Sequence, residues 1–204
     1  MLDPVGTPDR SGRRGPAPGA TRDEVVACAR RQFLACRRVD VQVLAATCGV
    51  GRATIYRWFG SREQILGEAM LGVVEERLAA ARAAVGGTGA DALMATIDLV
   101  YRGLSAAPHV RWLIDNERAT ALTVITSSSG QVHPRMTQII TAMIEAEVEH
   151  GYVPTADPVT LAYTLVRLAE GLLFNFTEDD IPKDLDRMRA VLAALIGAGR
   201  QRSG

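Results

Sequence analysis

The sequence predicts an all-α protein of about nine helices, in which three short N-terminal helices precede a larger helical part. Apolar residues recur at helical spacing along most of the chain, as expected for helices that each bury one face. The helical stretches open on capping side chains or on Pro and close near Gly, and no stretch is a convincing strand. The chain has 204 residues, enough to bury a core without disulfides or metal ions.

Composition excludes several classes of protein. With 48% hydrophobic and 23% charged residues, full-length disorder is not expected. The three cysteines, Cys28, Cys36 and Cys48, form no C-x-x-C pair, so neither a disulfide framework nor a zinc module fits. No apolar run reaches the ~18 residues of a membrane span, and residues 1–20 lack the apolar segment of a secretory signal. We therefore expect a soluble protein of the reducing cytoplasm with no membrane partner.

The charge is divided unevenly along the chain. Lys and Arg together match Asp and Glu at 23 each. Residues 1–64 nevertheless carry eleven Arg against six acidic residues, a net charge of +5, which leaves −5 for residues 65–204. A basic front part can face a polyanion while an acidic back part stays away from it.

The first three helices are expected directly after a disordered basic arm at residues 1–20, which holds three Arg and almost no large apolar side chain. A capping box at residues 21–24 opens a helix that runs to about Arg37. Asp40 is the expected N-cap of a second helix over 41–47, and Gly49 suits the positive φ of a tight turn. A third helix follows over 52–59.

The larger part is expected to begin with a long helix that starts at a second capping box, residues 61–64, and runs to about Val85. Gly86, Gly87 and Gly89 end this helix, and Pro108 and Pro134 suit the first position of later helices. The remaining helices are expected over residues 91–105, 108–125, 134–150, 158–176 and 182–197.

The last two of these helices have apolar faces too wide for the surface of a monomer. The helix over 158–176 is apolar nearly all round, and the helix over 182–197 offers Met188, Val191, Leu192, Leu195 and Ile196. A helix that is hydrophobic on every side is buried on every side. Either the first of them is a central core helix, or the pair forms a four-helix seam with its copy in a two-fold dimer.

A helix, a tight turn with Gly and a second helix inside a basic segment outline a helix-turn-helix. The helix over 52–59 turns Ile55 and Phe59 inward and Arg52, Thr54, Tyr56, Arg57 and Trp58 outward. Arg can fork to a guanine edge, hydroxyl groups reach phosphate oxygens, and aromatic rings contact thymine methyls or sugars. The alternative is that Trp58 or Tyr56 packs against the other domain.

The run LAATCGVGRATIYRWFGSRE over residues 44–63 resembles the signature of the TetR family of transcriptional regulators, and the resemblance covers residues 21–66. It implies a DNA-binding domain at 21–66 and a ligand-binding and dimerisation domain at 67–204. It also implies a repressor released by a small molecule. With the two-fold dimer expected through the last two helices, the operator is expected to be palindromic. The DNA-contacting residues that the resemblance implies are Arg22, Gln42, Arg52, Ala53, Thr54, Tyr56, Arg57, Trp58 and Arg62.

The sequence departs from the family pattern at four points. Gly51 stands where a Ser usually caps the recognition helix, which is the helix over 52–59 here. Ala53 replaces a frequent Gly, and Cys48 replaces a frequent Ala. The stretch between Phe33 and Val41 is about two residues shorter than in typical members. This short link, the run RATIYRW and the later run LVRLAE resemble the QsdR-like subgroup, whose namesake governs quorum-signal degradation.

Candidate ligand contacts follow from polar residues on the apolar helix over 158–176. Arg167 and Glu170 stand three apart there, and buried charges are costly unless they are paired. They form either an ion pair or, with Arg167 as the anchor, a site for a carbonyl, lactone or carboxylate in an apolar pocket. The residues expected around a small apolar or lactone-like effector are Met70, Trp112, Met143, Tyr163, Arg167, Glu170 and Phe174.

No catalytic or metal site is expected. His109, His133 and His150 lie far apart in the sequence and are expected at the surface or at helix ends. No nucleophile elbow or phosphate-binding Gly-rich loop occurs, so an enzyme is disfavoured and no cofactor is expected. The alternative function is a helical dimer that binds small molecules without binding DNA.

Overall fold

The computed structural model describes residues 20–174 and 181–199 of the chain. These residues form ten α-helices and no strand, which confirms the all-α fold. The basic arm expected at residues 1–20 lies outside them, apart from Ala20. None of the described helices is both long enough and apolar enough to cross a membrane.

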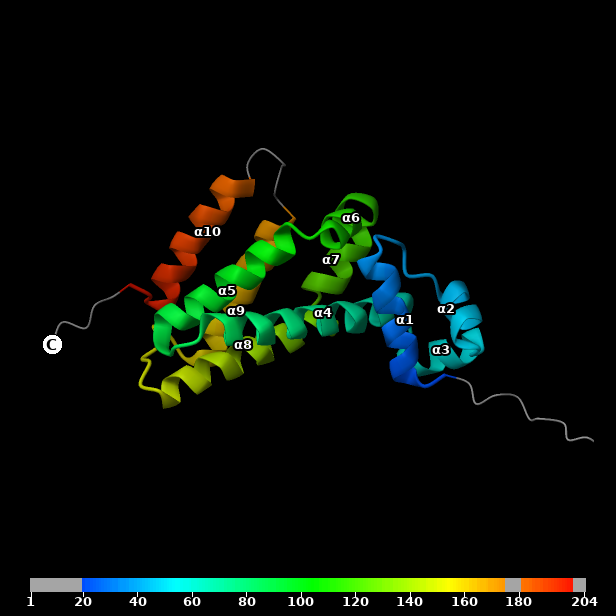
Figure 1. Cartoon of the computed structure of the whole chain (residues 1–204), viewed down its shortest axis with the longest axis horizontal. Coiled ribbons are helices and arrows are strands. Elements are labelled where there is room, and N and C mark those ends of the chain that lie inside the picture. The colour runs from blue at the N-terminus through cyan, green and yellow to red at the C-terminus, as the bar shows by residue number, and fades with distance from the viewer. Residues whose placement is uncertain (1–19, 175–180, 200–204) are drawn as a thin grey trace, which may run out of the picture.

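The helices form an elongated molecule with α1 to α3 at one end (Figure 1). The long helix α4 runs from that end toward α5, α8, α9 and α10, and α6 and α7 lie beside its first half. The bounds of the helices are α1 Arg22–Leu34, α2 Val41–Cys48, α3 Arg52–Phe59, α4 Arg62–Val85, α5 Gly89–Ser105, α6 Pro108–Asn116, α7 Arg118–Thr126, α8 Val132–Glu149, α9 Pro158–Leu173 and α10 Ile181–Ile196.

The caps of the first helices follow the sequence closely. Thr21 and Glu24 form the expected capping box, in which each side chain accepts a hydrogen bond from the other residue's N–H. The Asp40 carboxylate accepts from the N–H groups of two residues in α2, and Gly49 ends that helix at φ 63°. The Ser61 hydroxyl accepts from the Gln64 N–H at 3.2 Å, which is one of the two hydrogen bonds of the expected second capping box. The return bond to the Gln64 side chain is absent from the described chain.

Several expected boundaries were wrong. The helix expected over 108–125 is two helices, α6 and α7, because the backbone turns at Glu117 with φ −135° and ψ 44°. Pro134 is the third residue of α8 rather than its first, and α1 ends at Leu34 rather than near Arg37. The described chain therefore has ten helices where about nine were expected.

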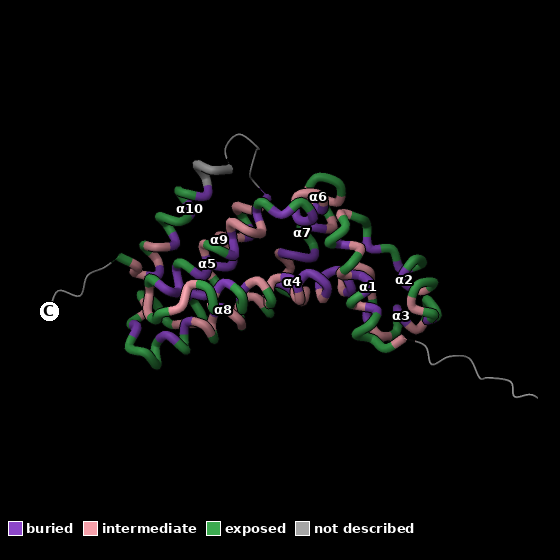
Figure 2. The backbone as a smooth tube through the Cα atoms, in the orientation of Figure 1, coloured by how far each residue is buried: buried purple, intermediate pink, exposed green. Residues whose placement is uncertain are grey.

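Figure 2 shows buried residues along α4, and these residues belong to two hydrophobic cores. The first half of α4 contributes Ile65, Leu66 and Met70 to a core shared with α1, α2, α3, α6 and α7. Its second half contributes Leu78 and Ala81 to a core shared with α5, α8, α9 and α10. The core of the N-terminal helices thus continues past residue 66 into α6 and α7, and α4 cannot shift without disturbing both cores.

Helix α9 is not buried on every side. It buries Leu161, Leu165 and Val166 but leaves Val159 58% and Tyr163 48% exposed. On α10, Met188 and Leu192 are buried while Val191 is 49% exposed. The interpretation of α9 as a central core helix was therefore wrong for this face, which is exposed.

The N-cap of α2 gives a stability prediction. Replacing Asp40 with Ala removes hydrogen bonds of 2.7 and 3.1 Å from the N–H groups of Gln42 and Val43, and we expect a loss of about 0.5–2 kcal/mol in the free energy of unfolding at neutral pH. The same two N–H groups lower the pKa of Asp40. The stabilisation is therefore present above the pKa of the unfolded chain and is lost as pH falls through the lowered pKa of the folded chain.

Urea denaturation at several pH values measures this effect. The control is Asp40→Asn, which caps equally well and should lose far less stability at neutral pH. Equal losses for the Ala and Asn variants would contradict the capping role.

Candidate nucleic-acid interface and internal cavity

Helices α2 and α3 present a mainly polar surface because most of their large apolar residues turn to one side, with Val43 an exposed exception. Leu44 of α2 and Ile55 of α3 are fully buried in the first core, and Phe59 is 6% exposed. The turn between the helices is closed by Gly49 and by a hydrogen bond from the Val50 N–H to the Ala45 carbonyl at 3.1 Å. Gly51 begins α3 without a side-chain cap, so the departure from Ser does not prevent the helix.

Five of the nine expected DNA contacts are exposed on α2 and α3. These residues are Gln42, Arg52, Ala53, Tyr56 and Arg57. Thr54 and Trp58 are half-buried instead, and Trp58 lies edge-on to Phe59 with ring centroids 6.5 Å apart. Trp58 also packs against the first core. The alternative that Trp58 packs inside the protein therefore accounts for part of its surface.

Arg62 and Arg22 are tied to the protein itself. The Arg62 Nε donates to the Val39 carbonyl at 2.7 Å, and its guanidinium pairs with Glu117 in a side chain only 13% exposed. The expected DNA contact of Arg62 does not match this placement, because its charge already has a buried carboxylate partner. Arg22 pairs with Glu68 and lies 4.6 Å from the centroid of the Phe59 ring, although its side chain stays 46% exposed.

The pair of Arg62 and Glu117 joins the N-terminal helices to the rest of the chain. Arg62 is the first residue of α4, and Glu117 is the turn between α6 and α7. Arg38 adds a second, exposed cation 3.9 Å from Glu117. The other carboxylate oxygen, Oε1 of Glu117, is buried and has no hydrogen-bond partner within the described chain.

An internal cavity of about 150 Å³ lies beside α4, with walls from α1 and from α5 to α9. Its walls are almost entirely apolar, with Val73, Ile97 and Leu165 among the lining residues. Polar side chains reach the lining at three residues, which are Tyr101, His109 and Glu170. Burial raises the pKa of Tyr101, so its hydroxyl stays neutral, and it donates to the Ala169 carbonyl at 3.4 Å.

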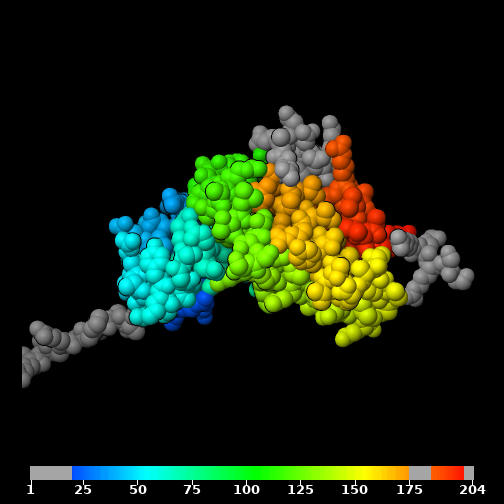
Figure 3. Space-filling model, turned by 180° about the vertical axis from the view of Figure 1, so that it is seen from behind, coloured from blue at the N-terminus to red at the C-terminus, as the bar shows by residue number. Residues whose placement is uncertain are grey.

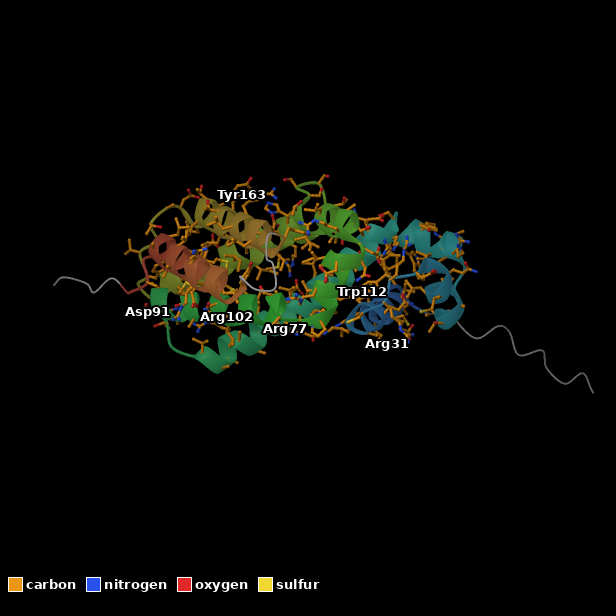
Figure 4. The ribbon with its side chains drawn as sticks, turned by 90° about the horizontal axis from the view of Figure 1, so that it is seen from above. Arg31, Arg77, Asp91, Arg102, Trp112 and Tyr163 are labelled. Carbon is orange, nitrogen blue, oxygen red and sulfur yellow. The ribbon has the colours of Figure 1, made fainter. Side chains whose placement is uncertain are left out.

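The structure brings two of the seven expected ligand residues to this cavity, Met70 and Glu170. The other five lie elsewhere, because the apolar ones fill the cores and the polar ones face outward. Tyr163 is half exposed on α9, and Figure 4 shows it well apart from Trp112. Phe174 is buried in the first core, Trp112 packs against the same core and Met143 packs against the second.

Arg167 and Glu170 form the ion pair that was one of the two interpretations. The two side chains are joined at 2.9 Å, and Glu170 also bonds His133 Nδ1 at 2.8 Å. Arg167 donates further to the Thr126 carbonyl and the Ser128 hydroxyl, both at 2.7 Å, and does not line the cavity. The anchoring role considered for Arg167 therefore finds no support in its position.

His109 is a cavity residue that sequence reasoning missed. It was expected at the surface or at a helix end, as were His133 and His150. His109 and His133 do stand in the first turn of α6 and α8, but both are buried, whereas His150 is exposed at the end of α8. The Nε2 atom of His109 is buried and has no hydrogen-bond partner within the described residues. Its spacing of four from the buried Leu113 was the available signal, because that spacing places both side chains on one face of α6.

The three cysteines are free, and the described residues hold no group of three His, Cys, Asp or Glu suited to a metal ion. The sulfur atoms of Cys28 and Cys48 lie 3.1 Å apart between α1 and α2. Burial and the contact with Cys28 raise the pKa of Cys48 to about 11, so this thiol stays protonated at neutral pH.

Residues 88–197, just over half of the chain, match the family described as tetracyclin repressor-like, C-terminal domain. The transcriptional repressor QsdR of R. erythropolis, a solved structure from the TetR family, is 25% identical with a TM-score of 0.75 and covers 90% of this chain and 97% of its own. The TetR family repressor AlkX of Dietzia sp. strain DQ12-45-1b, implicated in n-alkane biodegradation, is 21% identical with a TM-score of 0.62 and covers 87% and 98%. No curated protein matches the sequence.

The ion pair at the start of α4 gives a testable prediction. Arg62→Met leaves the buried Glu117 carboxylate with only the exposed Arg38 at 3.9 Å, and removing one member of such a pair costs about 3–5 kcal/mol of unfolding free energy. The side chains of Arg62 and Glu117 are 13% and 11% exposed, whereas those of the control pair, Arg135 and Glu75, are 51% and 41% exposed. Arg135→Met should cost at most about 1 kcal/mol.

Urea unfolding of the single variants and of the double variant Arg62→Met/Glu117→Leu measures the coupling. We expect the double variant to regain much of the stability that Arg62→Met loses, because no unpaired carboxylate remains. If the losses of unfolding free energy in the two single variants simply added in the double variant, this would contradict the buried pair.

Proposed function

Because the chain belongs to the TetR family of transcriptional regulators, we propose that it is a homodimeric repressor released from a palindromic operator by a small, mainly apolar molecule. Regulators of this family are not enzymes. The observation that carries the proposal is the exposed face of α3, where Arg52, Tyr56 and Arg57 point away from a buried Ile55 and Phe59. We propose residues 21–66 as the DNA-binding domain and residues 67–204 as the ligand-binding and dimerisation domain.

The proposed contacts follow from the chemistry of the exposed groups. Arg52 and Arg57 can donate to guanine edges or to phosphate, while Tyr56 and the half-buried Thr54 reach the backbone. Gln42 of α2 and the exposed edges of Ala53 and Trp58 complete the surface. Arg22 can contribute to binding of the DNA backbone through the exposed part of its side chain. Arg62 pairs with Glu117 instead and holds the start of α4 in place behind this surface.

Dimerisation through α9 and α10 is supported by the apolar side chains that these helices leave exposed. The two helices lie next to each other at the surface (Figure 3), and their outward residues include Val159, Tyr163 and Val191. A two-fold dimer of this kind presents two recognition helices to successive major grooves when their centres stand about 34–36 Å apart. The operator is then a palindrome with half-sites one turn apart.

The cavity supplies the proposed route to release. A molecule that enters it presses on α4, which carries residues of both cores. Movement of α4 changes the separation of the two recognition helices. By linkage, a coupling of about 1–3 kcal/mol would lower operator affinity roughly 5- to 150-fold, and the operator would lower ligand affinity by the same factor.

Substitutions on α3 test the DNA-reading surface. Tyr56→Ala should weaken binding to operator and to scrambled duplex alike, because it removes a backbone contact. Arg52→Ala should relax the preference at one base pair by about 1–3 kcal/mol. Fluorescence anisotropy, with an operator selected from the DNA upstream of the gene, measures both affinities at fixed salt.

The control is Arg135→Ala, an exposed arginine of α8 that pairs with Glu75 far from α3 in the sequence. The operator affinity of Arg135→Ala should stay within two-fold of that of the wild type. Unchanged operator affinity in Tyr56→Ala would show that α3 is oriented differently. Absence of any DNA binding by the wild-type dimer would favour the alternative of a ligand-binding dimer without DNA binding.

Charge on the outer faces of α9 and α10 tests the dimer. Val159→Asp and Val191→Asp place a carboxylate in the proposed apolar seam, so we expect monomers at micromolar concentration and loss of operator binding. The control is Val148→Asp, which alters an exposed valine near the end of α8. Analytical ultracentrifugation reports the mass, and a dimer in both α9 and α10 variants would place the interface elsewhere.

A further inference from the structure

We propose that the Nε2 atom of His109 is the single polar anchor for the effector, and that the effector is an uncharged, mainly apolar molecule with one hydrogen-bonding group. This inference rests on the proposed function, since it assumes that the cavity beside α4 receives the effector. It adds the residue that holds the molecule and the chemical class of the molecule.

The unsatisfied nitrogen is the first step of the argument. His109 is only 6% exposed, its Nε2 atom has no partner within the described chain, and the residue lines the cavity. A buried polar atom without a hydrogen bond costs about 1–3 kcal/mol. A ligand hydroxyl or carbonyl beside Nε2 would remove that cost, so the cavity favours molecules that bring one such group.

The protonation of His109 sets what it can bind. Burial lowers its pKa, and the charge of Arg77 acts in the same direction. The imidazole is therefore neutral at neutral pH, and its nitrogen either accepts or donates according to the tautomer. This suits an alcohol, ester or lactone and gives no positive charge to hold an acid.

The other polar side chains of the cavity wall also disfavour a charged ligand. Both oxygens of Glu170 are already bonded, one to His133 at 2.8 Å and the other to Arg167 at 2.9 Å. A carboxylate ligand would meet this acidic group with no Arg or Lys among the residues that line the cavity, and an unpaired charge in an apolar site is costly. The remainder of the wall is apolar, and a cavity of about this volume in another protein takes up benzene.

The position of His109 also connects it to the DNA-binding helices. Its ring lies edge-on to the ring of Phe33 in α1, with centroids 4.8 Å apart and an interplanar angle of 74°. Phe33 is itself buried and lines the same cavity. A ligand that bonds Nε2 fixes the imidazole and so changes the packing of α1.

Three small probes of nearly equal shape test the proposal. Benzyl alcohol is neutral with one hydroxyl, toluene lacks the polar group, and benzoate is charged. Each is titrated into the full-length protein, and the NMR signals of the methionine methyl groups give the affinity, because Met70 and Met136 line the cavity. We expect benzyl alcohol to bind at least three-fold more tightly than toluene, and benzoate to show no binding at the same concentrations.

His109→Phe keeps an aromatic ring and removes Nε2. We expect this variant to lose the preference for benzyl alcohol over toluene while its affinity for toluene changes less than two-fold, which also reports an intact cavity. His109→Gln, which restores a hydrogen-bonding group, should regain part of the preference. The control is Tyr101→Phe, because that hydroxyl already bonds the Ala169 carbonyl, and the preference should remain.

The amide signals around Phe33 provide the readout for the connection to α1. They should shift with benzyl alcohol in the wild type and much less in His109→Phe. A preference that survives in His109→Phe, benzoate binding as tight as that of benzyl alcohol, or no binding of any probe would overturn the proposal. His109→Phe should still bind operator in the absence of probe, so these results are separate from a failure of DNA binding.

Discussion

Helix α4 imposes the constraint on which the rest of the structure depends, because it belongs to two hydrophobic cores at once. It has 24 residues, about 36 Å at 1.5 Å per residue. Its first half is packed by α1 to α3 together with α6 and α7, and its second half by α5, α8, α9 and α10. A rigid element held in this way carries any repacking at one end of the molecule to the other.

Helix α6 is the second link between the cavity and the DNA-binding helices. The two buried side-chain atoms that lack a hydrogen bond in the described chain, His109 Nε2 and Glu117 Oε1, lie at its two ends. At one end His109 faces the cavity and touches Phe33 of α1. At the other end Glu117 holds Arg62, the first residue of α4. The unsatisfied atom of His109 can therefore bond a ligand in the cavity. The Glu117 carboxylate changes its contacts when α4 moves.

The sequence predicted best where structure depends on local chemistry. The caps at Thr21 and Asp40, the turn at Gly49 and the bounds of α3 depend on neighbouring residues, and all were confirmed. The break at Glu117 could not be predicted, because no Gly or Pro stands there and its carboxylate is held by Arg62, 55 positions away. Five of the seven expected ligand residues lie away from the cavity for a similar reason, since side chains at helical spacing fill the cores equally well, as Met143 and Phe174 do. The role proposed for His109 depends on a cavity that forms only when several helices pack together.

The distance between the two DNA-binding domains of a dimer tests the central claim that α4 transmits the state of the cavity. Ala46 is exposed on α2 and can carry a spin label once the native cysteines are replaced. Pulsed electron paramagnetic resonance then measures the distance between the labels of the two protomers. The account predicts that filling the cavity shifts this distance and that operator DNA opposes the shift. A distance that stays the same when the cavity is filled would contradict it.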